Sequence, residues 1–154
     1  MTIKNTPGLV KKFRRIPWRF QQTVERPHAS ELERFVSTIT TAHGHMEEAT
    51  VTIDKIIFNT ERMTALCPTD SALPLTRESS ISARSRDEIH ALLVAAFGDG
   101  PDFICIPTPK PFVFYADHDN WITFYAQTKS HLNHIIEPLS TQGFKLVENW
   151  QREV

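Results

Sequence analysis

Residues 112–150 contain the pattern that most constrains the fold, because a hairpin, a helix and a strand follow one another within it. Residues 112–116 and 121–126 are short runs rich in aromatic and β-branched side chains, which are typical of strands. Four polar residues separate the two runs, a length that suits the loop of a β-hairpin. The sequence therefore predicts two adjacent antiparallel strands here.

A helix and a last strand are predicted directly after this hairpin. The helix begins at about Ser130, and its apolar residues recur at helical spacing. Pro138 lies within that pattern and cannot donate a backbone hydrogen bond, so we expect a kink or an early end there. Gly143 is predicted to end the helix, and residues 144–150 are predicted to form the strand.

Two earlier helices are predicted from their N-terminal signals. Ser30 and Glu33 have the spacing of a capping box, in which each side chain satisfies a backbone N–H of the first helical turn. Ser85 and Glu88 repeat that spacing ahead of a second apolar stripe. The sequence predicts that glycines end these helices: Gly44 and Gly98.

Three further segments are predicted to be strands. Residues 49–58 and 102–106 are β-branched or apolar runs, and apolar side chains alternate in residues 16–20. Pro17 restricts the last of these to an edge of the sheet, because proline has no N–H to donate. Residues 60–84 combine prolines with many Ser and Thr residues, and their sequence predicts no particular element.

This order of elements predicts the fold class. Hairpins mixed with isolated helices are typical of an α+β fold, since parallel sheets need a helix between successive strands. We expect one domain spanning residues 1–154. Its sheet should be largely antiparallel, with about five to six strands, and three helices should pack mainly on one face of it.

The charge of the chain is unevenly distributed, although the net charge is only −1. Residues 1–27 hold seven basic side chains against one acid, Glu25, which gives +6, and the remaining residues carry −7. Such asymmetry indicates an anionic partner for the basic segment or a cationic partner for the acidic body. The alternative is that residues 1–20, as an extended arm or an edge strand, lie on the acidic body of their own chain.

The sequence predicts a cytoplasmic protein without membrane contact. No apolar run approaches the ~20 residues that a membrane-spanning helix needs. Lys11 and Lys12 follow the first apolar residues, so no secretory signal core forms. Cys67 and Cys105 lack a nearby cysteine, which favours two free thiols over a disulfide or a zinc site.

The hairpin loop holds the densest polar chemistry of the chain: Asp117, His118, Asp119 and Asn120. Asp and Asn are favoured in tight turns for backbone reasons, so turn formation is the first interpretation. The second is a contact with a partner, for which an exposed Tyr115 or Trp121 beside the loop would add an aromatic anchor. A histidine between carboxylates could also act as a base or bind a metal.

Two pairs of histidines have a spacing that suits a metal ion. His43 and His45 flank a glycine, and His131 and His134 lie one helical turn apart. Neither pair has a second pair nearby to complete a four-ligand site, so exposed positions at a helix end and on a helix face are favoured. Phosphate-binding, dinucleotide-binding and nucleophile-elbow motifs are also absent from the sequence. We therefore expect no metal and no cofactor, and the sequence favours a non-catalytic domain.

The last quarter of the chain resembles bacterial toxin-immunity proteins, including those that neutralise contact-dependent growth-inhibition toxins and related polymorphic toxins. The segments that carry this resemblance are Tyr115-Ala-Asp-His-Asp-Asn-Trp121, Phe124, His131-Leu-Asn133, Glu137-Pro-Leu139 and Gly143-Phe-Lys145.

This resemblance implies a function and a mechanism. Many toxins of this class are cationic nucleases, and their inhibitors present carboxylates where phosphate would otherwise bind. Acidic residues of this chain would supply such a surface: Asp99, Asp102, Asp117 and Asp119. His118, Asn120, Tyr115 and Trp121 would complete the surface, and the partner would be a cationic toxin domain.

Two other functions remain open. A small hydrolase or another enzyme would use His118 with a nearby carboxylate, such as Asp54 or Glu148. A nucleic-acid-binding module would use the basic and aromatic segment from Lys11 to Arg19, although the domain as a whole is not basic.

Overall fold

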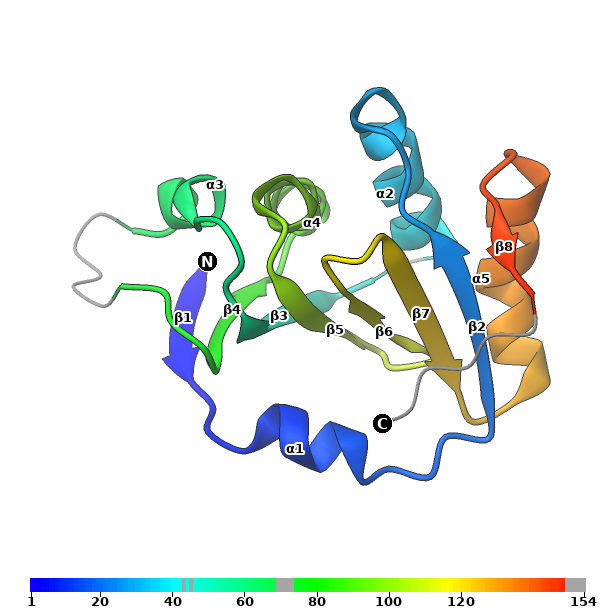
Figure 1. Ribbon diagram of the computed structural model, residues 1–154, viewed down its shortest axis with the longest axis horizontal. Coiled ribbons are helices and arrows are strands. Elements are labelled where there is room, and N and C mark those ends of the chain that lie inside the picture. The colour runs from blue at the N-terminus through cyan, green and yellow to red at the C-terminus, as the bar shows by residue number, and fades with distance from the viewer. Residues whose placement is uncertain (43, 45, 69–73, 149–154) are drawn as a thin grey trace.

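The computed structural model describes residues 1–42, 44, 46–68 and 74–148, and Figure 1 shows how their elements are arranged. Within these residues the chain has an α+β fold, as the sequence predicts. The described strands are β1 (Thr2–Asn5), β2 (Phe20–Glu25), β3 (Glu48–Lys55), β4 (Ser79–Ala83), β5 (Asp102–Thr108), β6 (Val113–Ala116), β7 (Trp121–Ala126) and β8 (Leu146–Val147). The described helices are α1 (Leu9–Arg14), η1 (Ala29–Glu31, a 3-10 helix), α2 (Leu32–Thr41), α3 (Glu61–Ala65), α4 (Arg86–Asp99) and α5 (Lys129–Thr141).

The strands form one sheet in the order β1-β4-β3-β5-β6-β7-β2-β8, and all neighbouring strands are antiparallel. The prediction of a largely antiparallel sheet is confirmed. The expected number of about five to six strands is too low, because the described part of the sheet has eight. Strands β1 and β4 have no counterpart in the prediction and lie side by side at one edge, and β2 overlaps the strand predicted over residues 16–20 only at Phe20.

Strand β4 lacks the usual sequence signature because three of its five residues are serines, which are not typical strand residues. Two of its serine hydroxyls instead hydrogen-bond to threonines of β3. The hydroxyls of Ser82 and Thr50 lie 2.8 Å apart, and those of Ser80 and Thr52 lie 2.6 Å apart. These cross-strand pairs satisfy polar groups on the sheet and stabilise a strand that apolar patterning alone does not reveal.

Helices α2, α3, α4 and α5 cover one face of the sheet, and α1 lies against the other (Figure 1). Three of the helices on the first face, α2, α4 and α5, are the three that the sequence predicts. The two additional helices, α1 and α3, have six and five residues. Such short helices have little periodicity of their own, and packing against the rest of the domain stabilises them.

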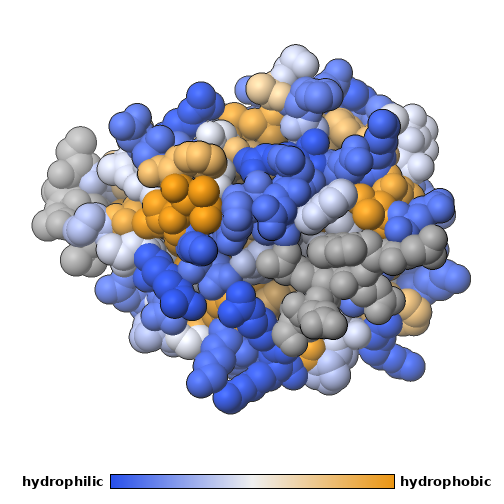
Figure 2. All heavy atoms as spheres, in the orientation of Figure 1, coloured by the Kyte–Doolittle hydropathy of each residue, from blue (hydrophilic) through white to orange (hydrophobic). Residues whose placement is uncertain are grey.

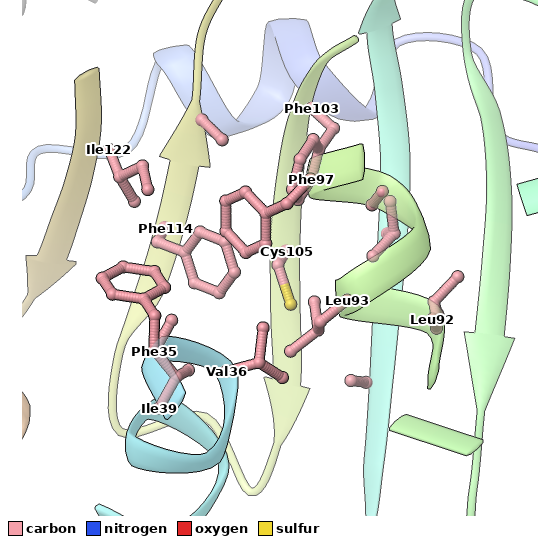
Figure 3. Packing of buried hydrophobic residues seen from close by; sticks show 14 of the residues in the cluster. Phe35, Val36, Ile39, Leu92, Leu93, Phe97, Phe103, Cys105, Phe114 and Ile122 are labelled. Carbon is pink, nitrogen blue, oxygen red and sulfur yellow. The ribbon is translucent and has the colours of Figure 1, made fainter. Parts of the chain in front are cut away.

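The main core lies between the sheet and α2 and α4, and Figure 3 shows its centre. Side chains from both helices meet side chains of β5, β6 and β7: Phe35, Val36, Ile39, Leu92, Leu93, Phe97, Phe103, Cys105, Phe114 and Ile122. The thiols of Cys67 and Cys105 are free, as expected, and burial raises the pKa of the Cys105 thiol far above its ordinary value. Cys105 therefore acts as a small apolar core residue.

A second, smaller core fills the space between α1 and the opposite face of the sheet. Val10 and Phe13, three residues apart on α1, are both buried against the sheet. The ring of Phe13 lies 5.3 Å from that of Tyr125 in an edge-to-face arrangement. The basic N-terminal segment is therefore packed onto the body of its own chain.

The N-terminal segment differs from the prediction of an extended arm or a strand over residues 16–20. Thr2–Asn5 forms an edge strand, Leu9–Arg14 forms a helix, and β2 begins only at Phe20. The alternation of Ile16 and Trp18 falls in the connection between α1 and β2. A helical spacing of buried residues at the start of the segment outweighs that short alternation.

The predicted helix starts have different outcomes. Ser85 caps α4, because its hydroxyl accepts a hydrogen bond from the Glu88 N–H at 3.1 Å. Ser30 does not cap α2: it lies inside η1, and the N-cap position is Glu31. A 3-10 turn therefore replaces the predicted capping box at the start of α2.

Three predicted ends also need correction. Helix α4 ends at Gly100, whose φ of 72° is left-handed, while Gly98 remains inside the helix. Helix α5 continues past Pro138 to Thr141, because Ile135 and Leu139 on either side of the proline are buried in the core. Strand β8 is only two residues long within the predicted range 144–150, and Trp150 lies outside the described residues.

Candidate functional site

The hairpin loop between β6 and β7 is built around Asp117, which is buried. Its Oδ1 atom accepts hydrogen bonds from the backbone N–H of Asp119 at 2.8 Å and of Trp121 at 3.3 Å. Asn120 has a φ of 73°, a left-handed conformation that Asn tolerates better than most residues. Asp117 and Asn120 therefore have the turn-forming role that their residue types suggest.

Asp102, the first residue of β5, fixes the neighbouring histidine. Its Oδ1 atom accepts the backbone N–H of His118 at 2.8 Å and lies 2.9 Å from Nδ1 of the same residue. The imidazole side chain is 37% exposed, and its Nε2 atom lies 3.6 Å from the Asp119 carboxylate. The hydrogen bond to Asp102 raises the pKa of His118 above its ordinary 6.5, and the charges of the surrounding carboxylates add to this effect.

We expect an NMR titration to give a His118 pKa above 6.5, and Asp102→Asn to bring it back toward that value. Because the folded-state pKa is raised, the stabilisation from this pair is complete below the unfolded-state pKa. It is lost as the pH rises through the folded-state pKa. An unchanged His118 pKa in Asp102→Asn would contradict this assignment.

Asp99 connects α4 to α3. Its two carboxylate oxygens accept the backbone N–H groups of Arg62 at 3.1 Å and Met63 at 2.9 Å. These are unpaired donors of the first turn of α3, where a carboxylate is favourable. Asp99 is 4% exposed, so it fixes the position of α3 and is not a surface residue.

The aromatic residues of the hairpin lie mostly in the core. Tyr115 is buried in the second core, and its hydroxyl donates a hydrogen bond to the carboxylate of Asp54. Trp121 is partly buried. Of the eight residues predicted to contact a partner, the structure leaves three exposed, all in the loop: His118, Asp119 and Asn120.

The structure adds an exposed aromatic residue that the sequence patterns did not single out. Phe58 is 75% exposed in the connection between β3 and α3, and Ile56 beside it is 36% exposed. Figure 2 shows a hydrophobic patch over this connection on an otherwise largely hydrophilic face. The sequence predicts one strand over residues 49–58, and its β-branched and apolar residues do not reveal that the strand ends at Lys55.

Four connections meet at this end of the sheet. The backbone N–H of Arg26, after β2, donates to the carbonyl oxygen of Asn120 at 2.8 Å. Gly100, after α4, lies against the side chains of Phe58 and Arg26. Together with the Asp102–His118 and Asp99–Met63 hydrogen bonds, these contacts join four connections: β2–η1, β3–α3, α4–β5 and β6–β7. We call the exposed residues of this region the loop-end surface: Glu25, Ile56, Phe58, Glu61, His118, Asp119 and Asn120.

The loop-end surface and its supports are rich in carboxylates. Six are present among the described residues of this region: Glu25, Glu61, Asp99, Asp102, Asp117 and Asp119. Four basic side chains accompany them among the described residues, including Lys145, whose carbonyl oxygen accepts the Glu25 N–H: Arg26, Lys55, Arg62 and Lys145. The guanidinium of Arg26 donates to the carbonyl oxygen of Phe97, and its burial lowers the pKa of Arg26 while the charge of Asp117 opposes that shift. The region therefore carries an excess of negative charge.

A polar cavity of about 410 Å³ opens beside this region, between α1 and the sheet. Asp54 lies in its wall, 2.7 Å from the Arg14 guanidinium and 3.8 Å from that of Arg77. His118 is bonded to Asp102, whereas Asp54 is occupied by Arg14 and Tyr115, and Glu148 is exposed after β8. Asp54 and Glu148, the carboxylates suggested as partners of His118 in an enzyme, therefore form no described hydrogen bond or ion pair with it.

His131 and His134 belong to no group of three or more potential metal ligands among the described residues. His131 and His134 are exposed on α5, and His43 and His45 lie outside the described residues.

In the part of the chain that the structure describes, no helix has the length and apolar character needed to span a membrane. No family model, curated protein or solved structure matches the chain significantly.

Proposed function

We propose that this chain is a non-catalytic, cytoplasmic protein-binding domain that neutralises a cationic bacterial nuclease toxin, and that the loop-end surface is its interface. The observation that carries the proposal is Phe58, a phenylalanine that is 75% exposed within a region rich in carboxylates. An exposed aromatic side chain with polar surroundings is typical of a binding hot spot, because its burial by a partner supplies much of the affinity.

The support beneath Phe58 favours binding over chance exposure. The ring rests beside Gly100, where a Cβ atom would lie 3.6 Å from it, and Asp99 fixes the following helix. A side chain held on fixed elements loses less conformational entropy when a partner covers it. The loop-end surface is thus pre-formed by the hydrogen bonds that join its four connections.

The charge of the region supports a cationic partner. Exposed Glu25, Glu61 and Asp119 would make direct contacts, while buried Asp99, Asp102 and Asp117 contribute to the field at the surface. A negative surface raises the association rate with a positively charged protein and occupies the groups that would bind phosphate. The proposed partner is the one that the sequence suggests. The direct contacts are assigned to exposed carboxylates, because three of the four carboxylates suggested by the sequence are buried.

The test is complex formation with the protein encoded by the reading frame immediately upstream. We expect a one-to-one complex in which nuclease activity is lost. Glu25→Lys with Asp119→Lys should lower the association rate constant about tenfold at low salt. Glu47→Lys with Glu137→Lys makes the same change of charge at exposed positions outside the loop-end surface and should have a much smaller effect.

Two results would overturn the proposal. One is the absence of any complex with the upstream protein. The other is an equal loss of association rate in both pairs of variants, which would show that only the total charge matters. Nucleic-acid binding by the free chain, lost in Lys11→Glu with Lys12→Glu, would favour the alternative function of the basic segment.

A further inference from the structure

A second cavity lies on the opposite face of the sheet from α2, α4 and α5, beneath α1. It has a volume of about 380 Å³, within the range of small-molecule sites. We call it the α1 groove, and apolar side chains form most of its wall: Leu9, Phe13, Ile16, Trp18, Ile106 and Val113. Four of these residues come from α1 and the connection after it, and the other two from β5 and β6.

The charged side chains among the described residues that line the α1 groove have one sign, and the nearby Glu78 carboxylate accepts the Gly8 N–H at 3.3 Å. Lys12 from α1 and Lys110 from the connection between β5 and β6 line it, and both are exposed. No acidic residue is among the described residues that line it. This is notable in a chain whose net charge is −1, and it gives the groove electrostatic complementarity to an anion.

Trp18 adds a third donor-only side chain to those of Lys12 and Lys110. Its indole N–H is sealed from solvent and has no hydrogen-bond acceptor among the described residues. A buried donor without an acceptor is costly, and a ligand oxygen would accept from it only if the groove widened and exposed the indole nitrogen. The polar groups offered by Lys12, Lys110 and Trp18 thus all donate hydrogen bonds.

Helix α1 is suited to adjust to a ligand. It has six residues, begins after Gly8 without a side-chain cap, and lies in isolation on its face of the sheet among the described helices. A helix of this length depends on its packing, which here comes from Val10, Phe13 and the pair between Arg14 and Asp54. The contacts that hold α1 are therefore separate from those of the main core.

We propose that the α1 groove binds a small carboxylic acid with an apolar body, such as a medium-chain fatty acid. The apolar part lies against Phe13 and Val113, and the carboxylate lies between Lys12 and Lys110. This site is separate from the loop-end surface and does not depend on the function proposed for it.

The experiment compares decanoate with decanol, which share an apolar chain and differ in charge. Calorimetry on the full chain should show saturable binding of decanoate. Lys12→Glu with Lys110→Glu should weaken decanoate binding at least about tenfold, equivalent to ~1.4 kcal/mol, and leave decanol binding unchanged. The control, Lys4→Glu with Lys145→Glu, makes the same change of charge at exposed positions that do not line the groove.

An NMR measurement locates the ligand independently of these variants. Decanoate should shift the indole N–H resonance of Trp18, because that side chain lines the groove. The proposal is overturned if decanoate does not bind saturably, if both variant pairs lose affinity equally, or if the Trp18 resonance stays unchanged at saturation.

Discussion

Phe114→Ala should lower the free energy of unfolding by about 3 to 5 kcal/mol, the usual cost of removing a buried phenylalanine. Phe114 is 1% exposed, and its ring lies 5.4 Å from that of Phe124 and 6.0 Å from those of Phe97 and Phe103. These rings come from α4 and from three strands, so the substitution leaves a cavity where the helix layer meets the sheet (Figure 3).

Chemical denaturation monitored by circular dichroism measures this loss. Phe58→Ala is the matched control, because it removes the same side chain from a position that is 75% exposed. It should change the free energy of unfolding by less than about 0.5 kcal/mol. A cost of less than about 1 kcal/mol for Phe114→Ala would contradict its central place in the core.

The hairpin and the long helices could be predicted from the sequence because their signals are local. The strands on either side of Asp117–Asn120, the cap at Ser85 and the apolar stripe of α5 all depend on residues close together in the chain. Short elements held by distant partners could not be predicted in this way. Strand β4 depends on hydroxyl pairs with β3, and α1 depends on packing against β6 and β7.

The candidate site shows the same division. The sequence located the loop and its polar residues, yet it could not show that Asp99 and Asp102 accept backbone N–H groups from distant segments. Burial of a carboxylate follows from such partners, which no local pattern reveals. Phe58 was hidden for the related reason that the predicted strand over residues 49–58 extends beyond the last residue of β3, Lys55.

Phe58→Ala should weaken binding to the partner by about 2 kcal/mol or more, roughly 30-fold, because an exposed aromatic anchor supplies much of the affinity of an interface. Phe58→Tyr keeps the ring and should retain most of the affinity. Ile56→Ala should have a smaller effect, since that side chain is only 36% exposed and has less surface for a partner to cover.

The dissociation constant of the complex with the upstream-encoded protein, measured by calorimetry for the wild type and for Phe58→Ala, tests the loop-end surface most directly. The wild type and Phe58→Ala should unfold at nearly the same denaturant concentration, so that a loss of affinity reports on the lost contact alone. We expect a dissociation constant at least about 30-fold higher for Phe58→Ala. An equal dissociation constant for the wild type and Phe58→Ala would contradict the interface proposed for this chain.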